Sequence, residues 1–333
     1  MENRTCPLVM SSLILSSFML SGCLSSEGSG ILESEGEPEE EFQGMDYAEC
    51  MIFEELERCW NVFVPSTVNI TDNVPLIIDL HGNTVTMQNQ RILSEFDEIA
   101  ENNGVMAVWP QGHNNSWNAG YCCSTAGQMG LNDTGFILDM IEIIALNHSV
   151  DVNRIYLTGW SNGCIMSQRM ALQASNLIAA VACTSGYLGF LDDSEYIPIP
   201  IMEMHGVFDE IAQYSNSVRI ALLEEDSQNI EAIQSGAHEN LYDWANFNGC
   251  EGLIADSITP NSSYTIERFT SCENNSEVVL FTSLNGGHNL YENDACDLGI
   301  GWSCWGNQGV FDTHQIIWDF VSRYSKNQTD NSL

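Results

Sequence analysis

Residues 155–163 read Ile-Tyr-Leu-Thr-Gly-Trp-Ser-Asn-Gly. The first four are apolar or β-branched and predict a buried strand, and the spacing from Cys164 to Ser175 predicts a helix directly after it. A G-x-S-x-G pattern between a strand and a helix predicts a sharp turn that lifts the serine hydroxyl clear of the backbone. The pattern alone is weak, so its position between a strand and a helix carries the prediction that Ser161 is a nucleophile.

Strands and helices alternate on both sides of this turn. The expected strands are Val74–Leu80, Val105–Trp109, Ile155–Thr158, Ile178–Cys183, Ile199–Met204 and Val278–Leu284. The expected helices are Arg91–Asn103, Gly135–Asn147, Cys164–Ser175 and Phe311–Tyr324. This alternation predicts an α/β fold with a mostly parallel, doubly wound sheet and helices on both faces. Catalytic groups of such sheets lie on loops at the carboxyl ends of the strands.

A serine hydroxyl needs a general base to become a nucleophile. Around this kind of turn the chain order is Ser, then Asp or Glu, then His, which leaves His238, His288 and His314. His288 follows a predicted strand, and two preceding glycines let its loop return over the sheet edge. We therefore expect His288 to be the base. His238, in a polar helical stretch, and His314, at the start of the last helix, stay as alternatives.

The acid that orients the base should follow the next strand but one after Ser161. Asp209 lies just past the strand that ends at Met204, so it is the expected acid. Its neighbour Glu210 is the main alternative. Asp192 and Asp193 precede that strand and fit less well, and an Asp in a turn is also a common capping residue.

Acyl transfer also needs two N–H groups that stabilise the oxyanion. We expect one from the backbone of Asn162, directly after the nucleophile. The second should come from the loop His81-Gly82-Asn83, where His81 and Gly82 follow the first predicted strand of the sheet. Because Gly82 has no side chain, the backbone can approach a substrate closely there.

Several separated segments, in this order and spacing, resemble the polyhydroxybutyrate (PHB) depolymerase and feruloyl esterase group of the α/β-hydrolase superfamily. They are Pro75–Gly82, Trp109–Gly112, Ser116–Gly120 with Cys122-Cys123, Asp133–Ile137, Val150–Tyr156, Gly159–Gly163, His205–Asp209, Asn248–Cys250 and Gly286–His288. The resemblance runs from about Arg58 to Tyr324. It implies an α/β-hydrolase fold and a catalytic triad of Ser161, Asp209 and His288.

The resemblance also implies contacts with substrate. Trp117 and Asn118 belong to a segment that borders the active site in this group, and Trp160 adjoins the nucleophile; Trp117 could equally be a core residue. The group often continues with Trp-Pro after the catalytic His, whereas this chain continues with Asn289-Leu290-Tyr291. A loop with Cys296, Trp302, Cys304 and Trp305 follows, so the choice of substrate stays open.

The charge balance excludes several classes of partner. The chain of 333 residues has 9 Lys+Arg and 46 Asp+Glu, a formal charge of −37. Binding nucleic acid requires clustered basic residues, and the single lysine is Lys326. Electrostatic docking on an anionic membrane is disfavoured for the same reason. An acidic surface suits an exported protein that stays soluble in salt water.

The first 45 residues predict targeting and a tether. Residues 8–20 form an apolar run that is shorter than the roughly 20 residues of a membrane span, so 1–22 is predicted to be a signal peptide. It ends in Leu20-Ser21-Gly22-Cys23, which resembles a lipoprotein cleavage site with Cys23 as the lipid attachment residue. An ordinary signal peptide is the alternative. Residues 23–45 are acidic and predict a disordered linker, and 46–333 form the esterase domain.

Twelve cysteines in an exported protein predict disulfides. Their local spacing favours Cys50–Cys59, Cys250–Cys272 and Cys296–Cys304, although spacing alone cannot fix the connectivity. Cys122, Cys123, Cys164 and Cys183 pair among themselves or stay as buried thiols. Structural use of these residues is favoured over a catalytic cysteine.

We therefore expect a surface-anchored or secreted serine carboxylesterase. Its substrate would be a polyester such as poly(3-hydroxybutyrate) or its oligomers, or alternatively a feruloylated or acetylated polysaccharide. A serine peptidase and a non-catalytic surface binding protein are more distant alternatives. The chemistry requires no metal or organic cofactor. We expect a monomer that meets the membrane only through its lipid anchor and binds no nucleic acid.

Overall fold

The computed structural model describes residues 44–68, 72–120, 122–189, 195–215, 236–292 and 311–326. All of them lie in one structural unit, Phe42–Leu333. The predicted signal peptide, Cys23, most of the acidic linker and the pair Cys296–Cys304 lie outside the described residues.

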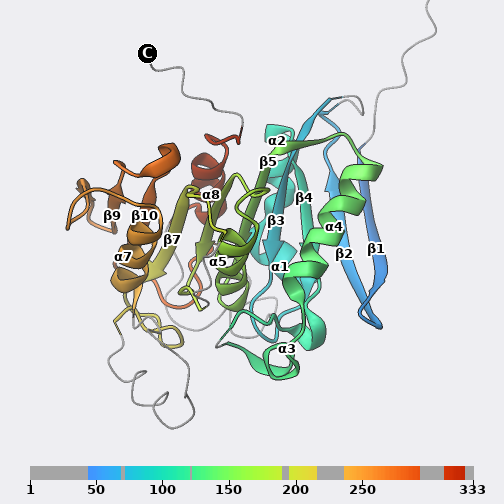
Figure 1. Cartoon of the computed structure of the whole chain (residues 1–333), viewed down its shortest axis with the longest axis horizontal. Helices are drawn as coiled ribbons and strands as arrows, with labels where there is room; N and C mark the ends of the chain where they lie inside the picture. Colours follow the sequence, from blue (N-terminus) through green and yellow to red (C-terminus); the bar gives the residue numbers. More distant parts are fainter. Residues whose placement is uncertain are drawn as a thin grey trace, which may run out of the picture. The chain divides into compact units, whose positions relative to one another are not determined.

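A ten-stranded sheet forms the centre of this unit, in the order β1-β2-β4-β3-β5-β6-β7-β10-β9-β8 (Figure 1). The six central strands are parallel to one another. They are β4 (Met106–Pro110), β3 (Val74–Leu80), β5 (Val150–Gly159), β6 (Ala180–Thr184), β7 (Ile201–Gly206) and β10 (Val278–Ser283). The outer strands pair antiparallel with their neighbours. They are β1 (Met45–Phe53), β2 (Leu56–Val64), β9 (Tyr264–Phe269) and β8 (Ser257–Pro260).

Alternating side chains of the central strands supply two apolar cores. In β3, Leu76 and Ile78 belong to one core, whereas Ile77 belongs to the other. The first core includes side chains of α4 (Asp133–Asn147), α5 (Asn162–Ala174) and α7 (Ala237–Phe247). The second includes side chains of α1 (Met87–Ser94), α2 (Phe96–Asn103) and α8 (Thr313–Val321). Because both faces are covered, the parallel strands read as continuous apolar runs.

The sequence predicted the six central strands and helices α4, α5 and α8 within a few residues. The single helix expected over Arg91–Asn103 was wrong, because Glu95 adopts a left-handed conformation with φ 51° and divides it into α1 and α2. The hairpin β1–β2, strands β8 and β9 and the short helix α3 (Ser124–Met129) were not predicted. No described helix has the length and apolar character required to cross a membrane.

Four disulfides form among the described residues of this fold. Cys50 and Cys59 face each other across the β1–β2 hairpin and are bonded, and Cys250 is bonded to Cys272. Both pairs are among those that the spacing predicts. Of the four cysteines whose state the sequence left open, Cys164 in α5 pairs with Cys183 in β6, and Cys122 pairs with its neighbour Cys123.

Candidate active site

Ser161 lies on the sharp turn between β5 and α5, with φ 56° and ψ −119°. Its N–H donates to the carbonyl of Thr184 at 2.9 Å, which fixes the turn against β6. The turn requires glycine on both sides. A Cβ on Gly159 would lie 2.7 Å from the Leu80 oxygen, and one on Gly163 would lie 1.9 Å from it. The G-x-S-x-G pattern is thus a steric requirement of the approach between this turn and β3.

His288 lies on the loop after β10 and contacts both other predicted members of the triad. Its Nε2 is 2.9 Å from Oγ of Ser161. Its Nδ1 is 2.8 Å from Oδ2 and 3.0 Å from Oδ1 of Asp209. The indole N–H of Trp160 donates to the His288 carbonyl at 2.7 Å and so holds the loop in place. The structure therefore brings the three predicted residues together, each at the carboxyl end of a different parallel strand.

The loops that carry the acid and the base are held against each other. The N–H of Phe208 donates to the Gly286 carbonyl at 2.9 Å. A Cβ on Gly206 would lie 2.4 Å from the carbonyl oxygens of both Gly286 and Gly287. Glycine at position 206 is therefore needed for the two loops to pass at this distance, which sets the separation of Asp209 and His288.

Asp209 is buried and heavily hydrogen-bonded. Its Oδ1 accepts from the N–H groups of Ile211 at 2.8 Å and Ala212 at 2.7 Å. Burial alone would raise the pKa of this carboxyl, but hydrogen bonds and charge from His205 and His288 outweigh it and lower the pKa below the usual range. Asp209 is therefore an anion under ordinary conditions and can orient and stabilise a protonated His288.

A small cavity opens in front of the nucleophile. Its volume is about 130 Å³, and it is lined by Asn83, Trp160, Ser161, Ile211 and His288. This is well below the roughly 300–1,000 Å³ typical of pockets for drug-sized ligands. The cavity formed by the described residues thus has room only for a small chemical group next to Ser161.

Two backbone segments border the position that an oxyanion would take. The N–H of Asn162 is the first of α5 and has no acceptor within that helix. In the loop after β3, Asn83 lines the cavity, whereas His81 and Gly82 do not. The ring of His81 is buried, and its Nε2 accepts from the Gly112 N–H at 2.8 Å. Burial lowers its pKa to about 4, so it is neutral and structural.

Comparison with known proteins agrees with this arrangement. Residues 58–196 match the family model described as Esterase PHB depolymerase. This part of the chain is similar to that esterase family. The solved structure of an acetyl xylan esterase from Aspergillus awamori has the same fold, with a TM-score of 0.55 at 14% identity over 76% of this chain and 98% of that one. The fold is that of the α/β hydrolases.

Two curated relatives have higher sequence identity. The bifunctional acetylxylan esterase/xylanase XynS20E of Neocallimastix patriciarum is 30% identical over 46% of this chain and 22% of its own length. Feruloyl esterase B of Piromyces equi is 28% identical over 64% of this chain and 39% of its own length. The chain thus matches less than half of the length of either relative.

Trp117 and Asn118, two of the three expected substrate contacts, do not line the cavity in front of Ser161. Trp117 is fully buried: its indole N–H donates to the His81 carbonyl at 2.9 Å, and its backbone is held by the Asn162 side chain. Asn118 donates from its amide to the Leu131 carbonyl at 2.8 Å. Neither lines the cavity, so both support the loops around it, and of the three predicted substrate contacts only Trp160 lies in its wall.

A buried ion pair supports this segment and was not predicted. Nη2 of Arg58 lies 2.6 Å from Oδ1 of Asp133, and both side chains are buried. Asp133 also accepts from the Asn118 N–H at 2.7 Å. The pair joins β2 and α4 to the loop behind the nucleophile.

Three other residues of the site were missed by sequence reasoning. Asn83 and Ile211 line the cavity, and Glu203 lies beneath Asp209 in contact with His205. The segments His81-Gly82-Asn83 and His205–Asp209 were recognised, but only the folded arrangement shows which of their side chains face the cavity. Among the described residues, no cluster of three or more His, Cys, Asp or Glu side chains has the arrangement of a metal site.

Proposed function

We propose that the chain is a carboxylic ester hydrolase that acts through an acyl-Ser161 intermediate. The observation that carries the proposal is the continuous line of contacts from Oγ of Ser161 through both ring nitrogens of His288 to the carboxylate of Asp209. A hydroxyl, an imidazole and a buried carboxylate in this order are the parts of a serine hydrolase.

Each group has a defined role in the proposed reaction. Nε2 of His288 takes the proton of Ser161 as Oγ attacks the ester carbonyl, and Asp209 stabilises the charged imidazole. The N–H of Asn162 and an N–H of the loop at Gly82 and Asn83 stabilise the oxyanion, each lowering the activation barrier by about 3–4 kcal/mol. His288 then protonates the leaving alcohol and activates water, which releases the acid and restores Ser161.

A short acyl group fits the site best. The cavity of about 130 Å³ has room for an acetyl-sized group beside Ser161, and the rings of Trp160 and His288 limit it. Relatives named acetylxylan esterase and feruloyl esterase indicate esters on a polysaccharide as the substrate class. We therefore propose an acetylated polysaccharide as the substrate.

A polyester is the second candidate, because of a specific surface feature. The side chains of Val207, Phe208 and Ile211 are exposed next to Asp209, with Phe208 58% exposed. An apolar rim of this kind would suit the alkyl side groups of hydroxybutyrate oligomers, and the family model is named after PHB depolymerase.

A panel of esters separates these substrates. The full chain and its Ser161→Ala variant would be assayed with p-nitrophenyl acetate, acetylated xylan, methyl ferulate and hydroxybutyrate trimer. We expect turnover of the first two by the parent alone. Higher kcat/KM on the trimer than on acetylated xylan would favour the polyester. Turnover by the Ser161→Ala variant would contradict the mechanism.

We also propose that the protein acts outside the cell. Four disulfides among the described residues are typical of an oxidising compartment. Anchoring through Cys23 remains a prediction. Expression in a bacterial host with lipoprotein processing should give a membrane-bound product whose Cys23→Ser variant is released. Equal release of both would contradict the anchor.

A further inference from the structure

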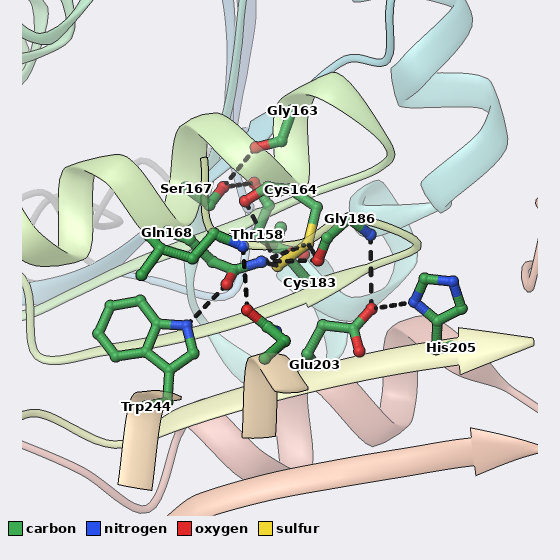
Figure 2. The surroundings of a disulfide bond; sticks show 12 residues. Thr158, Gly163, Cys164, Ser167, Gln168, Cys183, Gly186, Glu203, His205 and Trp244 are labelled. Carbon is green, nitrogen blue, oxygen red and sulfur yellow. Dashed lines mark hydrogen bonds and ion pairs between the residues drawn. A yellow bond between two sulfur atoms is a disulfide. The ribbon is translucent and has the colours of Figure 1, made fainter. Parts of the chain in front are cut away.

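His205 is a second buried histidine beneath the triad, and it lies between two carboxylates. Its Nδ1 is 2.7 Å from Oε1 of Glu203. Its Nε2 is 2.6 Å from the Ala212 carbonyl and 3.4 Å from Oδ2 of Asp209. Glu203 and His205 extend from β7 side by side (Figure 2). Both are buried, and because His205 and His288 each lie near Oδ2 of Asp209, this pair extends the line of contacts beyond Asp209.

The contacts of His205 determine its charge. Both ring nitrogens face oxygen acceptors, and only the doubly protonated imidazolium can donate from both. The ring of Tyr187 stacks on it with centroids 5.1 Å apart, and Tyr214 meets it edge-on, while their hydroxyls bond elsewhere, to the Gln213 carbonyl and to Thr282. Burial alone would lower the pKa of His205, but Glu203 and Asp209 raise it to about 10.

The other charged groups near this pair are already engaged. Glu267 of β9 pairs with His238 of α7 at 2.8 Å. Glu239 of α7 and Glu267 contribute negative charge near Tyr214. Besides His205, Oε1 of Glu203 has only the Gly186 N–H, at 3.4 Å, as a partner among the described residues, and Oε2 has none. His205 is therefore the main source of positive charge for Glu203.

We propose that Glu203 and His205 are positioning residues that hold a fixed positive charge against Asp209 and thereby set the acid limit of the pH range in which the enzyme is active. The proposal rests on the esterase function proposed above. Asp209 shares its negative charge between two imidazoles. When His205 is charged, Asp209 attracts a proton to His288 less strongly, so the free base needed to activate Ser161 persists to lower pH.

Two variants remove the charge and keep hydrogen-bonding groups in place. Glu203→Gln leaves a neutral His205 that accepts at Nδ1 and donates at Nε2. His205→Gln leaves a neutral amide and a buried Glu203 that becomes protonated. Both should move the acid limb of the kcat/KM profile upward by about half a pH unit or more. The double variant should shift the limb no further than either single variant, since the two residues act as one pair.

The pair His238–Glu267 supplies the matched control. It has a similar distance, 2.8 Å, but does not contact the triad, so His238→Gln and Glu267→Gln should leave the acid limb unchanged. An unchanged or downward-shifted limb in folded Glu203→Gln protein would overturn the proposal. So would equal shifts in the control variants.

A measurement on the parent protein covers the case in which variants do not fold. Nitrogen NMR of ¹⁵N-histidine-labelled full chain should show one imidazole that stays doubly protonated at pH 8. If all imidazoles are neutral at that pH, the proposal is wrong. This result is independent of turnover, so a parent without esterase activity would contradict the proposed function and still leave the charge of His205 measurable.

Discussion

At the scale of single residues, Gly163 has the least room for a Cβ of all the glycines that the structure describes. A methyl group there would lie 1.9 Å from the carbonyl oxygen of Leu80, a backbone atom that cannot move without displacing β3. We expect Gly163→Ala to lower the free energy of unfolding by roughly 1–3 kcal/mol and to reduce kcat/KM by displacing Ser161.

Gly127 is the matched control for this substitution. It lies in α3, and a Cβ at that position would have no heavy atom within 4 Å. Gly127→Ala should be neutral or stabilise the protein by about 0.4–1 kcal/mol. Urea unfolding of both variants tests this prediction. Equal losses in the free energy of unfolding at the two positions would show that the turn carrying Ser161 is not sterically restricted.

Asp79 should make stability depend on pH. It is buried in β3 and accepts from Gln90 at 3.0 Å and Trp109 at 3.1 Å, and burial raises its pKa to about 7. In the unfolded chain this group ionises near pH 4. Between about pH 4 and 7 the folded state holds a proton that the unfolded state has lost, so the contribution of Asp79 to stability falls as the pH rises, by about 1.4 kcal/mol per pH unit.

The Asp79→Asn variant tests this sign. It cannot ionise, so the difference in free energy of unfolding between parent and variant isolates the Asp79 contribution. The free energy of unfolding of the parent should fall relative to that of the variant as the pH rises from 4 to 7, and the difference should then stay constant. A constant difference over this range would mean that Asp79 is ionised in the folded protein at acidic pH.

That Ser161, Asp209 and His288 meet could be predicted from sequence, because each follows a mostly apolar strand in a fixed chain order. Glu203 could not, because it lies inside the strand β7, where an apolar residue is expected, and only the fold brings His205 beside it. The side-chain directions of Trp117 and Asn118 could not be predicted either: the Trp117 indole bonds to the His81 carbonyl and the Asn118 amide to the Leu131 carbonyl.

At the scale of elements, the disulfide between α5 and β6 should be a major stabilising link. Cys164 lies three residues after Ser161. Its disulfide with Cys183, which lies 19 residues further along the chain, closes a loop (Figure 2). Chain-entropy arguments give about 3 kcal/mol for a loop of this length. The Cys164→Ala/Cys183→Ala variant should lose about that much in urea unfolding.

The hairpin disulfide Cys50–Cys59 is the comparison for this prediction. It is distant from Ser161 along the sheet order, at the β1–β2 edge, so its removal should lower stability without changing kcat/KM. Loss of the α5–β6 bond should lower both, because α5 carries the nucleophile turn. Equal kinetic effects of the two double variants would contradict this link between α5 and catalysis.

Central strands were predictable and edge strands were not, for a physical reason. β3 and β7 are buried along their whole length, so their sequences are mostly apolar. β1 and β8 are largely exposed and mix polar and apolar residues, so they resemble loops. The break between α1 and α2 was missed because Glu95 takes a left-handed conformation that nothing in its residue type indicates.

At the scale of the whole molecule, the charge of −37 should make stability sensitive to salt. Repulsion between like charges opposes the compact state, and the screening length falls from about 30 Å at 0.01 M salt to about 3 Å at 1 M. The melting temperature should therefore rise as sodium chloride increases from 0.01 M to 0.5 M. Potassium chloride should raise the melting temperature by the same amount as sodium chloride, because both salts screen charge equally. A constant or falling melting temperature would contradict the expected repulsion between surface charges.

The central claim is that Ser161 is acylated during turnover. The most direct measurement is intact-protein mass spectrometry after reaction with a fluorophosphonate, followed by peptide mapping, on the parent and its Ser161→Ala variant. The account predicts one adduct on the parent, located on Ser161, and none on the folded variant. An adduct on another residue, or equal labelling of the variant, would contradict it.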